Sequence, residues 1–180
     1  MDKQKIIKTI SEERFHPYLI RCDNNRKEAL KLYQTNIEVS QAFYTSLSVL
    51  EISLRNKIDE AFKKHFNSPN WLTEKLPPAL LKQVVEIEVG LNKAKKPTTN
   101  SNILAELNFG FWTTLFNRKY ARFFWKPLHR IFINMPKQQR KRTEVSSRLN
   151  HIRTFRNRIY HYEPIIWNNE ALIKKRNEIK

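Results

Sequence analysis

Apolar residues recur every three or four positions through a long stretch that begins at Arg26. Six of them follow one another at spacings of 4, 3, 4, 4 and 4, which is one face of an α-helix: Phe43, Leu47, Leu50, Leu54, Ile58 and Phe62. The pattern predicts a helix from Arg26 to about Phe66, with Asn36 as a candidate break. The turn-forming residues 67–70 are expected to end it.

A second long helix is predicted toward the C-terminus. Its apolar face steps along the chain at 4, 3, 3 and 4, through Val145, Leu149, Ile152, Phe155 and Ile159. We expect this helix to begin near Pro136 and to reach Tyr160 or His161. Pro164 disfavours the helical conformation at the residue before it and therefore places the end of the helix.

Shorter helices are predicted on either side of the first long one. Ser11, with two glutamates behind it, is typical of a helix N-terminus, and Pro17 is expected to interrupt that helix. Another helix is expected to open at Pro77-Pro78, because proline is tolerated in a first turn.

A polar loop is predicted for residues 93–102, and an apolar segment for the core follows it. Ser101 or Asn102 is expected to cap this segment, ILAELNFGFWTTLF, which is apolar almost all round. It contains Gly110, and a glycine inside a helix costs about 1 kcal/mol relative to alanine. We expect close packing against another helix at this glycine, with Phe111 and Trp112 in the core.

Glycine is scarce, with 2 residues among 180. Tight hairpins depend on glycine, so the composition disfavours β-sandwiches and barrels, and no glycine-rich phosphate loop is present. The chain is therefore predicted to be all-α. We expect a single helical domain over residues 1–180, with a leader and a short helix in residues 1–25 and a tail helix in residues 168–180.

The chain is strongly basic, with 34 Lys and Arg against 17 Asp and Glu and a net charge of +17. Such a charge favours a polyanion such as nucleic acid, although a solvated lysine-rich surface would have the same composition. Cys22 is the only cysteine, and the histidines form neither an HxH nor an HExxH pair. The sequence therefore predicts neither a metal site nor a bound cofactor.

No secretory signal and no membrane-spanning run is apparent in the sequence. The most apolar stretch, residues 103–116, carries Glu106 and Asn108 and is shorter than the roughly 20 residues that a bilayer requires. We therefore expect a cytoplasmic protein with no membrane contact.

Several residues that bear chemistry lie close together at the end of the last long helix. Asn157 and His161 are four residues apart and share a face, whereas Arg156 lies about 140° away from His161 at 100° per residue. From a single helix, the side chains of Arg156 and His161 do not easily contact the same small chemical group, such as one phosphate. Two copies of the helix, related by a two-fold axis, would allow the arginine of one to face the histidine of the other.

Arginine and histidine in this position suit phosphate chemistry. An arginine is always charged and suits a phosphate, and a histidine that titrates near neutrality suits proton transfer. The alternative is that both side chains only cap the carbonyl groups of the last helical turn.

The segment Arg156–Asn157–Arg158–Ile159–Tyr160–His161 resembles the Rx4–6H motif of HEPN domains. The wider sequence resembles the Abi-like (AbiD/AbiF-type) abortive-infection proteins of bacteria. Four blocks carry this resemblance in the family's order: SEERFHPYL (11–19), LEISLRNKI (50–58), LNFGFWTTL (107–115) and RNRIYHYEPI (156–165).

The resemblance implies an HEPN-like helical bundle, with long antiparallel helices and extra short helices, that forms a homodimer with a composite active site. It also implies a metal-independent endoribonuclease that cleaves RNA through its own 2′-OH, in phage defence or as a toxin. By the same resemblance Arg156, Asn157 and His161 are catalytic, and an antitoxin or a phage-derived activator is an expected partner. Family members often have His-His-Glu-Pro where this chain has His161–Tyr162–Glu163–Pro164.

Other basic residues in and around this motif and elsewhere in the chain are the expected RNA contacts, because cations bind phosphates in a salt-dependent manner. They are Arg118, Lys119, Arg122, Lys137, Arg140, Lys141, Arg142, Arg153 and Arg158. The candidate groove residues beside the motif are Arg55, Asn56, Tyr162 and Glu163. Two other functions remain open, a non-catalytic RNA-binding protein and a phage-sensing helical interaction protein.

Overall fold

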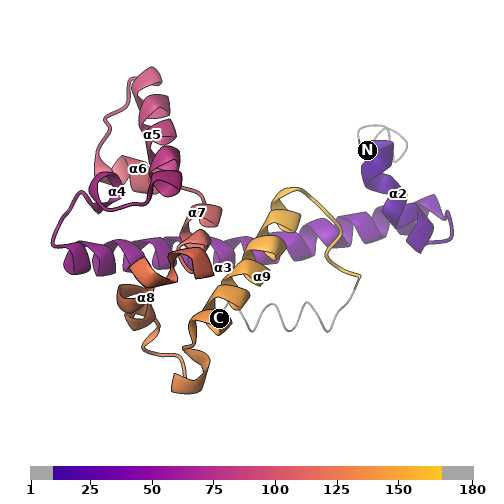
Figure 1. Ribbon diagram of the computed structural model, residues 1–180. Helices are drawn as coiled ribbons and strands as arrows, with labels where there is room; N and C mark the ends of the chain where they lie inside the picture. The colour runs from indigo at the N-terminus through magenta and orange to yellow at the C-terminus, as the bar shows by residue number, and fades with distance from the viewer. Residues whose placement is uncertain (1–9, 168–180) are drawn as a thin grey trace. The chain divides into compact units, whose positions relative to one another are not determined.

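The computed structural model describes residues 10–167, and every regular element among them is helical (Figure 1). These residues form eight α-helices and three 3₁₀ helices, with no strand. The prediction of an all-α chain is confirmed for them. The tail helix expected in residues 168–180, and the first nine residues of the leader, lie outside the described part of the chain.

The elements follow one another with short connections. In chain order they are α2 (Glu12–Arg21), α3 (Arg26–Phe66), α4 (Trp71–Glu74), α5 (Pro78–Lys93), α6 (Asn100–Glu106), α7 (Phe109–Thr114), η1 (Arg118–Tyr120), α8 (Ala121–Leu128), η2 (His129–Phe132), η3 (Lys137–Gln139) and α9 (Arg142–Tyr160).

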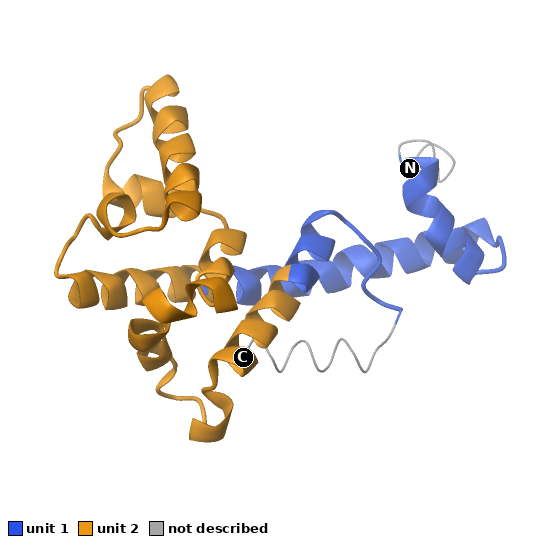
Figure 2. Ribbon diagram, viewed as in Figure 1, with its two compact units in different colours: residues 1–49, 154–180 blue, residues 50–153 orange. Residues whose placement is uncertain are grey.

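The chain forms two compact units, shown in Figure 2. Unit 1 takes in Met1–Val49 and Thr154–Lys180, and unit 2 takes in Leu50–Arg153. The helices α3 and α9 each begin in one unit and end in the other.

In unit 1, α2 begins as the sequence predicts but is not interrupted. The side chain of Ser11 accepts a hydrogen bond from the backbone N–H of Arg14, which caps the helix. The expected interruption at Pro17 is wrong, because α2 runs through this residue to Arg21. Phe15 and Tyr18, on either side of the proline, are both buried, and their burial offsets the roughly 3 kcal/mol that an interior proline costs.

Aromatic rings make up much of the core of unit 1. The ring of Tyr18 lies 5.2 Å from that of Tyr33 and 5.1 Å from that of Trp167. Farther along α3, the ring of Phe43 meets that of Phe155 edge to face at 4.9 Å. The first half of α3 is thus packed against α2, against the end of α9 and against the residues that follow α9.

The core of unit 2 is built around Phe62 of α3. Its ring lies 4.7 Å from that of Trp71 and 5.1 Å from that of Phe124, so α3, α4 and α8 meet there. The indole N–H of Trp71 donates to Asp59 at 2.9 Å, which satisfies the polar edge of a fully buried ring.

The apolar segment 103–116 lies in the core, as predicted, but it forms two helices, α6 and α7, instead of one. Phe111 and Trp112 are fully buried. Thr99 caps α6, so the expectation of a cap at Ser101 or Asn102 is wrong. The first piece, α6, ends at Glu106, and Asn108 caps α7, its side chain accepting from the N–H of Phe111 at 3.0 Å.

The last long helix begins later than expected and ends where it was expected to end. Residues near Pro136 form the separate element η3, and α9 starts at Arg142, whose guanidinium donates to the carbonyl of Phe116 at 3.1 Å. The five apolar residues of its predicted face are all buried. The helix ends at Tyr160.

The two glycines give a matched test of the helical packing. Gly90 lies in α5 with open space around it, whereas a Cβ on Gly110 would lie 2.9 Å from Oδ1 of the capping Asn108. The packing partner expected at Gly110 is therefore mainly the cap of its own helix. Arg153 comes only within 3.9 Å, which is ordinary contact.

We predict that Gly90→Ala raises the free energy of unfolding by about 1 kcal/mol, because alanine favours the helix over glycine. Gly110→Ala should bring no such gain, because displacing the Asn108 cap costs about 1 kcal/mol. Urea denaturation of both variants measures the difference. Equal stabilisation by the two substitutions would contradict this explanation of Gly110.

Candidate functional site

The residues after α9 form a tight, fully bonded turn. The N–H of Tyr162 donates to the carbonyl of Ile159 at 3.0 Å, and the N–H of Glu163 donates to that of Arg158 at 2.8 Å. With Tyr162 at a positive φ of 57°, these bonds make a Schellman motif. Residues 158–163, which we name the C-terminal turn, place His161 directly beyond the last helical residue.

An ion pair reinforces this turn. Arg158 Nε lies 3.3 Å from a carboxylate oxygen of Glu163, at the two positions where a Schellman motif usually has an apolar contact. The guanidinium of Arg158 also donates to the carbonyl of Pro164. Both side chains are partly exposed, so the pair contributes little by itself, but it gives Arg158 a structural role at the helix end.

Asn36 of α3 binds the chain just beyond the turn. Its side-chain oxygen accepts from the N–H of Ile165 at 2.8 Å, and its side-chain nitrogen donates to the carbonyl of Glu163 at 3.3 Å. Asn36 is fully buried, and α3 runs through it without a break. The break expected at Asn36 is therefore wrong, because its polar atoms bond to another segment and leave its own helix intact.

Arg156 stacks on an aromatic ring one turn along the same helix. Its guanidinium carbon lies 4.2 Å from the centre of the Tyr160 ring, which is 38% exposed. That ring in turn contacts Tyr44 of α3, with ring centres 5.2 Å apart. Burial raises the pKa of Tyr44, and the nearby Tyr162 and Tyr160 raise it further.

A second cation lies on the same group of tyrosines. The guanidinium of Arg14, in α2, lies 5.4 Å from the centre of the Tyr162 ring. We name Tyr44, Tyr160 and Tyr162, with Arg14 and Arg156, the aromatic–arginine cluster. Exposed aromatic rings beside arginines are the groups on which single-stranded bases stack.

His161 and Asn157 both lie on the surface beside this cluster. Their backbones are joined by a hydrogen bond of 2.9 Å from the N–H of His161 to the carbonyl of Asn157. Both side chains are exposed. An imidazole in this position is accessible to a ligand.

The other basic residues expected to bind RNA fall into two groups, one held by contacts within the protein and one exposed. Arg140 and Arg142 donate to backbone carbonyls of Met135 and Phe116, and Arg153 is half-buried near Gly110. The remaining cations of this set in unit 2 are exposed: Arg118, Lys119, Arg122, Lys137 and Lys141. Lys119 lies over the ring of Tyr120 at 5.3 Å.

The expected groove residues fall into two separate units. Tyr162 and Glu163 belong to unit 1 and take part in the C-terminal turn. Arg55 and Asn56 belong to unit 2, and their side chains are hydrogen-bonded to each other at 3.4 Å.

Within residues 10–167, no three side chains among His, Cys, Asp and Glu come together as a metal site. No helix in the same part of the chain is long and apolar enough to cross a membrane.

Three contributors to this site were missed by sequence reasoning. Tyr44 and Arg14 lie more than a hundred residues from the motif, and Asn36 has the appearance of a helix breaker. The signal that was present is the number of tyrosines around the motif, because Tyr160 and Tyr162 flank His161 directly.

Comparison of the chain with models of protein families, with curated proteins and with solved structures gives no match.

The bonds of Asn36 yield a prediction about stability. Asn36→Ala leaves the N–H of Ile165 and the carbonyl of Glu163 without their buried partner, and we expect the free energy of unfolding to fall by about 2 kcal/mol. Gln34→Ala, at an exposed position of the same helix, should change it by less than about 0.5 kcal/mol. Urea denaturation measures both, and equal effects would contradict the role given to Asn36.

Proposed function

We propose that this protein is a metal-independent endoribonuclease of the HEPN type, active as a homodimer in phage defence or as a toxin. The observation that carries the proposal is the end of α9, where Arg156 lies on an exposed tyrosine and His161 stands exposed beyond the last helical residue. The Abi-like sequence blocks and the net charge of +17 support it.

The proposed reaction needs no group from outside the protein and the RNA. The 2′-oxygen of a ribose attacks the adjacent phosphorus, and the bond from phosphorus to the 5′-oxygen of the next nucleotide breaks. A neutral histidine takes the proton of the 2′-OH, and a protonated histidine gives one to the leaving 5′-oxygen. The products are a 2′,3′-cyclic phosphate and a 5′-hydroxyl end.

Two histidines are required for this scheme, and each chain supplies one at the motif. Tyr162 stands where related motifs have a second histidine, so the acid and the base are the two copies of His161 in a dimer. Arg156 stabilises the charge that develops on the phosphoryl oxygens, and its stacking on Tyr160 limits the positions of its guanidinium. Asn157, one turn before His161, positions the imidazole or the phosphate.

The exposed cations of unit 2 suit the binding of RNA without regard to sequence. Arg118, Lys119 and Arg122 follow one another along η1 and the start of α8, and Lys137 and Lys141 lie before α9. Contacts of this kind with phosphates weaken steeply as salt is raised. These cations supply affinity for RNA, whereas the residues at the C-terminal end of α9 supply the groups that cleave it.

Cleavage of RNA in EDTA tests the proposal, with a second histidine of α9 as the control. We expect the purified protein to cut total bacterial RNA in EDTA and to leave cyclic-phosphate ends. His161→Ala should slow cleavage by about 100-fold or more, the usual contribution of a general acid or base. His151→Ala, at another exposed position of α9, should cut as the parent does.

Two results would contradict the proposal. One is equal cleavage by the parent and His161→Ala, and the other is intact RNA of every class with the parent protein. If the parent bound RNA without cutting it, and His161→Ala bound equally well, the alternative of a non-catalytic RNA-binding protein would be favoured.

A further inference from the structure

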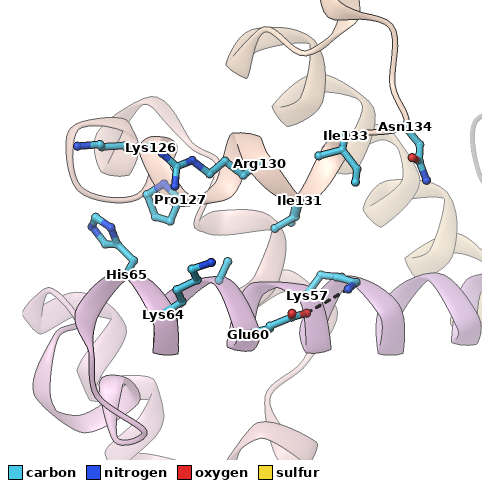
Figure 3. Close-up of a pocket in the computed structure, with 11 residues that line it drawn as sticks. Lys57, Glu60, Lys64, His65, Lys126, Pro127, Arg130, Ile131, Ile133 and Asn134 are labelled. Atoms are coloured by element: carbon cyan, nitrogen blue, oxygen red, sulfur yellow. Dashed lines mark hydrogen bonds and ion pairs between the residues drawn. The ribbon is translucent and has the colours of Figure 1, made fainter.

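Unit 2 contains a groove whose residues are not those of the candidate site at the C-terminal end of α9. It has a cavity volume of about 750 Å³, within the usual range of ligand sites. Figure 3 shows its two walls, one formed by the last turns of α3 and the other by α8, η2 and the residues after η2. We name it the basic groove.

Positive charge dominates the lining of the basic groove. Lys57 and Lys64 come from α3, and Lys126 and Arg130 come from the facing wall. Glu60 is the only carboxylate that lines it, and it is paired with Lys57 at 3.0 Å. Among the described residues, Lys64, Lys126 and Arg130 form no ion pair, so positive charge exceeds negative charge along the groove.

The helical geometry spaces these cations along the groove. Lys57 and Lys64 are seven residues apart, which is two turns and about 10 Å along one face of α3. Lys126 and Arg130 are separated by about one turn on the other side. Beneath them, the contact between the rings of Phe62 and Phe124 joins the two walls, so the spacing belongs to the packed core of the unit.

Apolar surface lies beside the charges. Pro127, Ile131 and Ile133 line the groove, and the side chain of Ile133 is 67% exposed. The imidazole of His65 also lines it and packs edge to face against Phe66, with ring centres 4.8 Å apart. Cations for phosphates next to apolar and planar groups for bases and sugars are what a nucleotide chain requires.

We infer that the basic groove binds the phosphates of a single RNA strand, as a contact surface additional to the α9 end. The identity of the polyanion as RNA rests on the function proposed above. A strand fits better than a free nucleotide, because the cations are distributed over two walls and about two helical turns instead of converging on one point. Lys57, Lys64, His65 and Arg130 thereby gain a function that the sequence patterns did not indicate.

Binding of an uncleavable strand tests this inference separately from catalysis. The probe is a fully 2′-O-methylated oligoribonucleotide of about 12 nucleotides, within the site size of known single-strand grooves. The groove variant is Lys64→Ala/Lys126→Ala/Arg130→Ala. The control is Lys75→Ala/Lys82→Ala/Lys93→Ala, which removes the same charge from exposed positions of the same unit outside the groove.

We expect the groove variant to bind the probe at least about tenfold more weakly than the parent. The slope of log K against log salt should become shallower by about 2, since each lost phosphate contact on a single strand contributes about 0.7. The control variant should keep the affinity within about threefold and the slope within about 0.5. Lys64→Arg/Lys126→Arg/Arg130→Lys, which keeps the charges, should bind as the parent does.

Three results would overturn the inference. The first is a groove variant whose affinity and salt slope are unchanged, and the second is an equal loss of affinity in the control variant. The third is ATP that binds as tightly as the oligonucleotide and loses affinity equally in the groove variant. The last would identify a mononucleotide site. Failure of the nuclease proposal is distinguished by the cleavage assay, because RNA binding in the groove does not require His161.

Discussion

Asn36 joins two segments that lie far apart in the sequence. Its buried side chain bonds both to the carbonyl of Glu163 and to the N–H of Ile165, so the path of the chain beyond α9 is fixed to α3. A buried backbone group that loses its partner costs about 1–3 kcal/mol, which makes alternative paths for this segment unfavourable. The C-terminal turn ends at this attachment, and the turn determines where His161 stands.

Around this attachment, the residues of the motif fall into two groups by their contacts. Arg158 and Glu163 bond to each other at the turn, which makes them supports of the structure. Arg156 stacks on the ring of Tyr160, and His161 stands exposed beyond the helix end. Arginines that look alike in the sequence thus make different contacts: Arg158 pairs with Glu163 at the turn, whereas Arg156 stacks on an aromatic ring.

The periodic features of the fold could be predicted from the sequence. The apolar faces of α3 and α9 and the end of α9 before Pro164 follow from local spacing and the restrictions of proline. Pro17, Asn36 and the cap at Asn108 were misjudged or missed. The first two are decided by contacts with distant residues, such as Tyr18 with Trp167 and Asn36 with Ile165.

For the candidate site, the motif residues could be predicted but their surroundings could not. Arg156, Asn157 and His161 lie in one short segment, so their spacing is visible in the sequence. Tyr44 and Arg14 reach the same surface only through the packing of unit 1, and the basic groove exists only through the packing of α3 against α8. These contacts join residues far apart in the sequence, so no local sequence pattern predicts them.

We propose that one active site uses His161 from two chains, and the activity of mixed dimers tests this directly. Parent and His161→Ala chains are co-expressed in equal amounts, and the RNase activity in EDTA is compared with that of the parent alone. Random pairing leaves both histidines in one dimer of four, so a composite site should leave about a quarter of the parental activity. Half of the parental activity would show that each chain acts alone and would contradict the composite site.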